Sequence, residues 1–386
     1  SRGKEAASAL PIGVALLGWA GVALGILVKG PIIVLVLAGT IAGLAWQGAG
    51  TRPLSGLRPR LGIVLVGLVV LPWLILITLR SQGAFLQDSV GQDLLGKLLD
   101  AETAGRLPPG MHVLMFWLGF WPGSLLVILA LPWIWASRRD AGVGFCLAWA
   151  IPTWVAFELP MTKLIHYVLP AYPALALMTA AWIVRGAERP WPPLLRGSAV
   201  AVWATLTAGI CTAIIALPVM LEGKVLLLPA VLALVAAALL AAVPIYVLPR
   251  PFAALVAMIA SGPLLFSAAG LTLPRLEKPF PSRTLAAVLP RLASCPQPEI
   301  VSVGYEEPSL VFLTTSTIRF LPGPAAADAL AQSACALAIV EKREERGFLQ
   351  RAEQLGARPQ SLATIEGINS ANSRRVALTI YARPRR

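Results

Sequence analysis

Three short segments place ionisable side chains next to long apolar stretches, and these are where chemistry is expected. A charge beside a lipid-embedded helix costs at least about 2.5 kcal/mol, so it needs a physical reason. In the first segment, Lys29-Gly30-Pro31, glycine and proline interrupt a helix, and the lysine can offer its ammonium to a phosphate. The alternative is a lysine at a helix end that only reaches the aqueous surface, and the segment alone favours that alternative.

The second segment is the polar stretch 80–110, which carries Asp93, Lys97 and Glu102 and is followed directly by His112. Asp93 and Lys97 are four residues apart, so on a helix they share one face. They can form a surface pair that contributes about 0.3 to 0.5 kcal/mol. They can equally belong to an amphipathic helix at the membrane interface, with the charges over a site. Spacing alone does not decide between the two.

The third segment, residues 158–172, has the sequence ELPMTKLIHYVLPAY between two apolar stretches. His166 can carry a proton near neutral pH, and Lys163 can hold an anion. Tyrosines at the headgroup level are the simpler interpretation for Tyr167 and Tyr172. For Lys163 we expect a function, because it lies close to an apolar edge with one acidic residue nearby.

Other kinds of chemistry lack their sequence signals. The chain has no H-E-x-x-H, C-x-x-C or G-x-S-x-G pattern, and its two histidines are too few for a histidine-rich metal centre. The sequence therefore requires no cofactor, although a divalent metal stays open. Lysines at one face of a membrane instead indicate handling of a phosphate-bearing lipid.

The elements that must position these residues are membrane helices. Hydrophobic residues make up 57% of the 386 residues, charged residues only 13%, and the mean hydropathy is +0.75. Such a composition is typical of an α-helical polytopic membrane protein, since lipid cannot satisfy open backbone groups. Nine apolar stretches are long enough to be considered as spans: residues 8–28, 32–47, 61–79, 111–136, 143–159, 167–184, 199–220, 225–248 and 252–272.

The positive charges predict the orientation. Alternate polar loops differ in their content of lysine and arginine, and the richer set should face the cytoplasm. The loop 80–110 and everything after residue 272 are then outside; a bacterial inner membrane, with the tail in the periplasm, is what the resemblance described below implies. The net charge of +13 reflects these loops and anionic lipid, so no nucleic-acid partner is expected.

The tail has the pattern of a small α/β domain, so the expected domains are residues 1–272 and 273–386. Short β-like runs are expected at 299–303, 317–321, 335–341 and 375–381, with helical stretches at 325–332 and 342–355. No glycine-rich phosphate loop follows a strand, so the tail is expected to pack or recognise rather than bind a nucleotide.

The four cysteines divide by their surroundings. Cys146 and Cys211 fall within apolar stretches and are expected to be small core residues. Cys295 and Cys335 lie in the polar tail and can pair only if that tail is extracytoplasmic. The sequence leaves their pairing open.

Several segments resemble the bacterial aminoarabinose transferases and the related protein O-mannosyltransferases, polytopic enzymes of the GT-C type that take a sugar from a polyprenyl phosphate. The similar segments are GILVKGP (25–31), GAFLQDSVGQDLLGKL (83–98), ETAGRLPPG (102–110), FWPGS (120–124), TKLIHYVLPAYPALAL (162–177) and, in the tail, YEEPSLVF (305–312). Two features differ: members commonly have a histidine shortly before the PPG, where this chain has Ala104, and their catalytic acid lies in a first outer loop. We expect that loop upstream of Ser1, in a longer protein.

The resemblance implies a glycosyltransferase that moves a sugar from a polyprenyl-phosphate donor to a lipid, glycan or protein acceptor. Lipid A or another envelope component is an example of such an acceptor. Membrane lipids are expected as further partners. The implied donor phosphate ligands are Lys29, Lys97 and Lys163. The implied catalytic residues are Asp93, Glu102 and His166. Tyr167 and His112 are expected to line the substrate cavity. A transporter or flippase of lipid-linked sugars would need the same lysines but no base, and a noncatalytic membrane scaffold is a third alternative.

Overall fold

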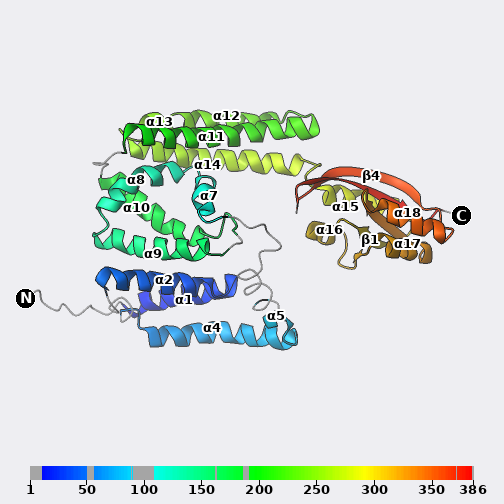
Figure 1. The fold of residues 1–386 in the computed structure, drawn as a ribbon, viewed down its shortest axis with the longest axis horizontal. Coiled ribbons are helices and arrows are strands. Elements are labelled where there is room, and N and C mark those ends of the chain that lie inside the picture. The colour runs from blue at the N-terminus through cyan, green and yellow to red at the C-terminus, as the bar shows by residue number, and fades with distance from the viewer. Residues whose placement is uncertain are drawn as a thin grey trace, which may run out of the picture. The chain divides into compact units, whose positions relative to one another are not determined.

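The computed structural model describes residues 11–49, 56–87, 89, 108–160, 163–185, 191–370 and 372–384 (Figure 1). The chain divides into two compact units, one ending at Gly209 and including Ala238–Ala260, the other formed by Ile210–Ala237 and Ser261–Arg386. Each is described by itself below. The predicted domain boundary between residues 272 and 273 stays a prediction.

Helices dominate the chain up to Thr272. The longer ones are α1 (Ile12–Lys29), α2 (Ile32–Leu44), α4 (Pro59–Arg80), α7 (Met111–Gly119), α8 (Ser124–Ala136), α9 (Ala141–Glu158), α10 (Tyr172–Arg185), α11 (Pro193–Glu222), α12 (Leu227–Ala241) and α14 (Pro251–Thr272). Short turns of helix lie between them: η1 (Ala45–Ala49), α5 (Ala84–Leu86), η3 (Leu169–Ala171), α13 (Val243–Tyr246) and η4 (Leu273–Arg275).

In the described part of the chain, six helices are long and apolar enough to cross a membrane, and three shorter ones are also apolar. Each of the nine predicted stretches overlaps one of these nine helices. The stretch 111–136 is wrong as a continuous helix, because it breaks into α7 and α8. Pro122 and Gly123 lie at the break, where proline offers no backbone N–H and glycine adds conformational freedom.

Glycines allow close helix contacts in the first unit. A Cβ added at Gly43 of α2 would lie 2.8 Å from the Ala148 carbonyl oxygen of α9, and one at Gly39 would lie 3.1 Å from Pro152. The two glycines are four residues apart, the small-xxx-small spacing that lets helix backbones approach in membranes. A Cβ added at Gly62 of α4 would overlap the Trp19 ring of α1, so this glycine also allows a close contact between helices.

Proline inside a helix leaves a carbonyl without its usual donor, and α8 shows how one such group is satisfied. Pro132 cannot donate to the Ile128 carbonyl oxygen, four residues earlier. The Trp191 indole N–H donates to that oxygen at 2.7 Å. A side chain from another segment therefore completes the α8 backbone, as expected where no water competes.

The tail contains a mixed five-stranded sheet in the order β2-β1-β3-β5-β4. The strands are β1 (Glu299–Val303), β2 (Arg319–Phe320), β3 (Ala336–Glu341), β4 (Gln360–Asn369) and β5 (Arg374–Ala382). Strands β2, β1 and β3 are parallel, whereas β5 is antiparallel to both β3 and β4. The helices are α15 (Pro281–Leu292), α16 (Pro308–Leu313), α17 (Gly323–Gln332) and α18 (Glu345–Gln354).

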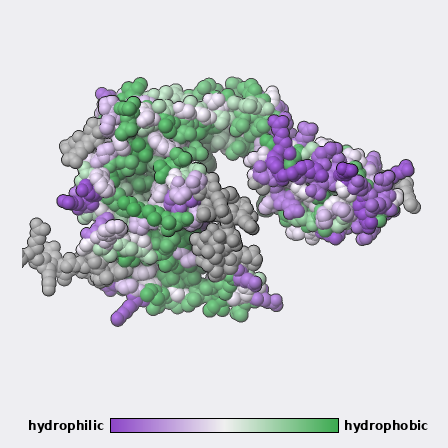
Figure 2. Space-filling view, in the orientation of Figure 1, coloured by the Kyte–Doolittle hydropathy of each residue, from purple (hydrophilic) through white to green (hydrophobic). Residues whose placement is uncertain are grey.

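Each face of this sheet buries its own apolar cluster. On one face, Leu285 of α15 and Leu310 of α16 join Ile339 and other strand residues. On the other face, Phe348 of α18 and the alanines of α17 pack against Val340 and its neighbours. Alternating residues of one strand thus serve two cores. The surface of this region is largely hydrophilic, whereas the long helices carry apolar side chains outward (Figure 2).

The sequence predicts four of the five strands and two of the four tail helices. Strand β4 is absent from the prediction, because Glu366, Gly367 and Asn369 lower its β-propensity. Helix α15 is missed because Pro281 and Pro290 mask a strongly one-sided apolar pattern. The α/β class of the tail is confirmed.

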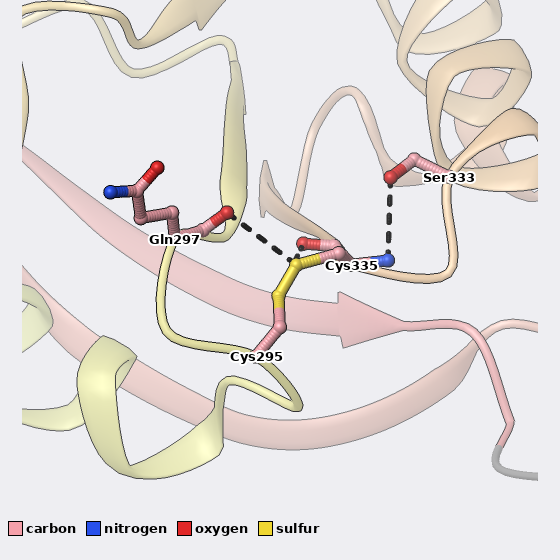
Figure 3. The surroundings of a disulfide bond; sticks show 4 residues. All are labelled: Cys295, Gln297, Ser333 and Cys335. Atoms are coloured by element: carbon pink, nitrogen blue, oxygen red, sulfur yellow. Dashed lines mark hydrogen bonds between the residues drawn. A yellow bond between two sulfur atoms is a disulfide. The ribbon is translucent and has the colours of Figure 1, made fainter.

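Cys295 and Cys335 form a disulfide, with Cα atoms 6.0 Å apart (Figure 3). The bond links the segment after α15 to the start of β3, so it closes a loop that contains β1, α16, β2 and α17. Cys146 and Cys211 are buried free thiols, as predicted.

Candidate functional site

A buried histidine and a carboxylate join two of the segments that the sequence singles out. His112, in the first turn of α7, is fully buried, and its Nδ1 lies 3.0 Å from Oε2 of Glu158 at the end of α9. The other carboxylate oxygen accepts the Gly110 backbone N–H at 2.7 Å. The His112 Nε2 lies 3.2 Å from the Leu164 carbonyl oxygen. The end of the 80–110 loop and the Lys163 segment therefore share one set of hydrogen bonds.

The protonation of this pair follows from its partners. The Leu164 carbonyl only accepts, so the His112 Nε2 must carry a hydrogen. The Nδ1 faces a carboxylate oxygen, so one further proton lies between the imidazole and Glu158. The pair is charge-assisted when that proton is on the ring, which makes the bond shorter and stronger than one between neutral groups.

Lys163 lies next to this pair and is almost entirely buried, with 4% of its surface exposed. Its Nζ donates to the Pro160 carbonyl oxygen at 2.8 Å. The residue also takes part in a further interaction within the protein. The role of Lys163 as a phosphate ligand stays a prediction.

Lys29, His166 and Tyr167 come together from two segments. The Lys29 Nζ, at the end of α1, lies 5.9 Å from the centroid of the Tyr167 ring. The His166 ring is edge-on to the same tyrosine at 5.1 Å between centroids. Lys29 and His166 are exposed, whereas Tyr167 is half-buried. The structure thus brings Lys29 beside the segment that carries Lys163, although 134 positions separate the two lysines in the sequence.

Aromatic rings pack beside these polar groups. Phe116, Phe120 and Tyr172 stack or meet edge-on, with centroids between 4.8 and 5.9 Å apart. The Tyr172 hydroxyl is buried without a hydrogen-bond partner among the described residues, beside Gly119. These rings form an apolar wall beside the partly exposed polar groups.

The other predicted site residues stand as follows. Asp93, Lys97 and Glu102 lie outside the described residues, so their roles stay predictions. His112 is brought to the site, but both ring nitrogens are engaged, which favours positioning of the segment over contact with a substrate. Glu158 and the Gly110 N–H were not predicted as its partners, because 46 residues separate the acid from the histidine.

Within the described residues no group of three or more histidine, cysteine or acidic side chains can hold a metal ion.

No family model and no curated protein matches this chain. Two crystal structures are similar to it, ArnT from Cupriavidus metallidurans bound to undecaprenyl phosphate and the same protein in the apo state. Both give a TM-score of 0.63, at 17% and 15% sequence identity. The alignments cover 98% and 97% of this chain, and 71% and 70% of the ArnT chains.

At these identities the match establishes the fold. This chain has the ArnT fold, that of a polytopic helical membrane protein with a small C-terminal α/β region. The resemblance to aminoarabinose transferases, which rested on six short sequence segments, is confirmed at this level.

Proposed function

We propose that this protein transfers a sugar from a polyprenyl-phosphate donor to an acceptor at the outer face of a bacterial inner membrane. The observation that carries the proposal is the similarity of fold over nearly the whole chain to a structure that holds undecaprenyl phosphate. The acceptor is a lipid, a glycan or a protein, and lipid A is one candidate. Fold alone does not decide function, so the residues of the site must support the same chemistry.

The lysines supply that support. Donor recognition requires cations beside an apolar region, because the donor joins a phosphate to a long hydrocarbon. Lys29 and Lys163 provide two ammonium groups from segments that meet at Tyr167. Phe116, Phe120 and Tyr172 form the apolar wall next to them. The proposal adds Lys97, from the outer loop, as a third phosphate ligand.

In the proposed reaction, an acceptor oxygen or nitrogen attacks the anomeric carbon, and the bond from that carbon to the phosphate oxygen breaks. The polyprenyl phosphate leaves with the bonding electrons, and the lysines stabilise the charge that develops on it. Asp93 and Glu102 orient hydroxyl groups of the sugar or acceptor. His166 takes part in moving the acceptor's proton.

The proposed side of the membrane has two supports. Lysine and arginine are concentrated in the loops expected inside, which leaves the Lys163 segment and the tail outside. The Cys295–Cys335 disulfide is the second, since disulfides persist in oxidising compartments such as the bacterial periplasm.

Donor binding is the direct test, because it does not depend on the identity of the acceptor. In the full-length gene product, Lys163→Ala should weaken binding of undecaprenyl phosphate by about ten- to a hundredfold. That range corresponds to about 1.5 to 3 kcal/mol for a charge-assisted contact in a dry site. Lys163→Arg should recover part of the affinity, because it keeps the charge but not the shape of the ammonium. The control is Lys224→Ala, an exposed lysine on the same expected side.

Thermal unfolding in detergent separates the donor role from a structural role, since Lys163 is buried and also bonds to the Pro160 carbonyl. A Tm that falls while donor affinity is retained would show that Lys163 only braces the segment after α9. Donor affinity unchanged in both Lys163→Ala and Lys29→Ala would contradict the proposed site. Donor binding without any sugar transfer by the full-length protein would point to transport instead.

A further inference from the structure

An apolar groove lies in the first unit, and one of its lining residues, Trp154, also contacts Phe116 of the candidate site. It is lined by residues of α8, α9 and α10 and by the segment that starts at Trp191, and its volume is about 630 Å³. Three tryptophans contribute to its wall, Trp135, Trp154 and Trp191, together with aliphatic residues such as Leu131, Ile151 and Met178. We call this the tryptophan groove. Its size falls within the roughly 300 to 1,000 Å³ range typical of ligand sites.

The indole N–H of Trp191, one of the polar groups at the groove, is already used. The Trp191 indole N–H donates to the Ile128 carbonyl, so this residue offers only its ring to an occupant. The lining is otherwise aliphatic and aromatic, and it provides no ring of hydroxyls or amides for a sugar. The chemistry of the wall therefore fits a hydrocarbon chain.

Arginines stand at one end of the groove. The Arg138 guanidinium lies 4.8 Å from the ring centroid of Trp135, which itself lines the groove, and Nη1 donates to the Trp135 carbonyl oxygen at 2.7 Å. Arg185 pairs with Asp140 at 3.0 Å, so the nearby carboxylate is engaged elsewhere. Among the described residues Arg138 has no acidic partner. Four of its five N–H groups are left for a ligand.

This arginine end is far from the lysines of the candidate site. Helix α9 begins one residue after Asp140 and ends at Glu158, beside His112. Its 18 residues correspond to a length of about 27 Å, close to the thickness of a hydrocarbon core. The two cationic groups therefore belong to opposite ends of the same helix and, in a membrane, to opposite leaflets.

We propose that the tryptophan groove binds an anionic phospholipid of the leaflet that faces the arginines, with an acyl chain along the tryptophans and the phosphate at Arg138. Basic groups beside openings between membrane helices favour anionic headgroups, and the cytoplasmic leaflet is rich in them. The indole rings suit the boundary between chain and headgroup. The proposal does not rest on the proposed sugar transfer, although Trp154 of the groove contacts Phe116 of the candidate site.

The test is native mass spectrometry of the full chain in detergent, titrated with phosphatidylglycerol and with phosphatidylcholine of the same acyl chains. Phosphatidylglycerol should be retained preferentially. Arg138→Gln should reduce its retention by about fivefold, the effect of one basic residue at an anionic surface, and should leave phosphatidylcholine unchanged. Arg60→Gln is the matched control, because Arg60 is exposed on the same expected side at the start of α4, outside the groove.

A second variant tests the groove itself. Ile151→Trp adds volume at a half-exposed lining position without opening the core, so it should lower retention of both lipids while Tm stays close to that of the parent protein. Equal retention of the two lipids, or equal losses in Arg138→Gln and Arg60→Gln, would overturn the proposal. Displacement of phosphatidylglycerol by one equivalent of undecaprenyl phosphate would also overturn it, since the groove would then hold the donor.

Discussion

Two half-buried or buried carboxylates, one in each region of the molecule, are stabilised by different kinds of donor. Glu307 in the tail accepts the Ser370 backbone N–H and hydroxyl through one oxygen and the Ser309 hydroxyl through the other. Glu158 among the membrane helices accepts the Gly110 N–H and faces the His112 imidazole. The first carboxylate has neutral donors throughout, whereas the second has a titratable partner.

This difference separates a structural network from one that can respond to its surroundings. Neutral hydroxyl and amide donors cannot change charge near neutral pH, so the Glu307 network fixes the turn between β4 and β5 in one form. The serine network also extends to the buried Tyr305 hydroxyl through Ser282. Burial is the main reason that the pKa of Tyr305 is raised well above its ordinary value. At Glu158 the facing group is an imidazole, beside the segment proposed to bind the donor.

The largest expected effect concerns the Cys295–Cys335 disulfide, which lies in the tail together with the Glu307 network. Replacing Cys295 and Cys335 together by serine should lower the tail's stability by about 4 kcal/mol, because the bond closes a loop of about 40 residues. Hydrogen exchange of amides in β3 and β5 measures this loss. Reductant should reproduce it in the parent protein, whereas Cys146→Ala, which keeps the disulfide, should exchange like the parent protein. Unchanged exchange would show that the serine network holds the tail without the disulfide.

The next effect tests the network itself. Glu307→Ala leaves the Ser370 N–H and the Ser309 hydroxyl without their acceptor, and we expect a loss of about 2 to 4 kcal/mol in the same exchange measurement. Glu306→Ala is the matched control, because this neighbouring side chain is exposed. If both variants exchange alike, the buried carboxylate contributes nothing beyond a surface charge.

A smaller effect is expected at the titratable pair. His112→Ala should lower stability in detergent by about 1 to 3 kcal/mol, since the Glu158 carboxylate loses a charged or polar donor. It should also weaken undecaprenyl phosphate binding, because the Leu164 carbonyl next to Lys163 is no longer held. His166→Ala serves as the stability control, since its ring is exposed. A His112→Ala protein with parental Tm and parental donor affinity would remove the pair from the proposed site.

The smallest effect is a pH dependence in the tail. Hydrogen bonds from Lys342 and then from Tyr381 lower the pKa of Glu345. A lowered pKa stabilises the fold fully above the ordinary carboxyl value near 4.5, and this contribution is lost as the pH falls through the folded-state pKa. Glu345→Gln should therefore destabilise the tail at pH 7, by less than about 1 kcal/mol, and have no effect near pH 2.

The control is Glu353→Gln on the same helix, an exposed position. Protein stability measured by urea unfolding at several pH values gives the comparison. A difference between Glu345→Gln and the parent protein that is the same at every pH would show that the ion pair and the tyrosine bond do not respond to protonation.

Composition and apolar spacing were sufficient to predict the helical membrane class and the α/β tail. They cannot reveal where a long apolar stretch breaks, since α7 and α8 differ from one continuous helix only through Pro122 and Gly123. Strand β4 was not predicted from the sequence, because its partners, not its own residues, stabilise it. Cross-strand neighbours on β5 supply that context.

The site was predictable in its segments but not in its contacts. Lys29 and Lys163 stand out because charges beside apolar stretches are costly. The bond between His112 and Glu158 could not be deduced, since no local period links residues 46 positions apart. The burial of Lys163 likewise depends on α7 lying against the end of α9, which is a property of the packed helices.

The contact of α2 with α9 bears on how relatives of this chain can be found. Gly39 and Gly43 face backbone or ring atoms at 3.1 and 2.8 Å from where a Cβ would be, so even alanine at Gly43 would push the two helices apart. Selection should therefore tolerate little drift at these two positions, although most apolar residues around them can be exchanged for one another. A glycine pair four residues apart, eight residues after a Lys-Gly-Pro turn, is therefore expected to be a more durable signature for sequence searches than the helices that surround it.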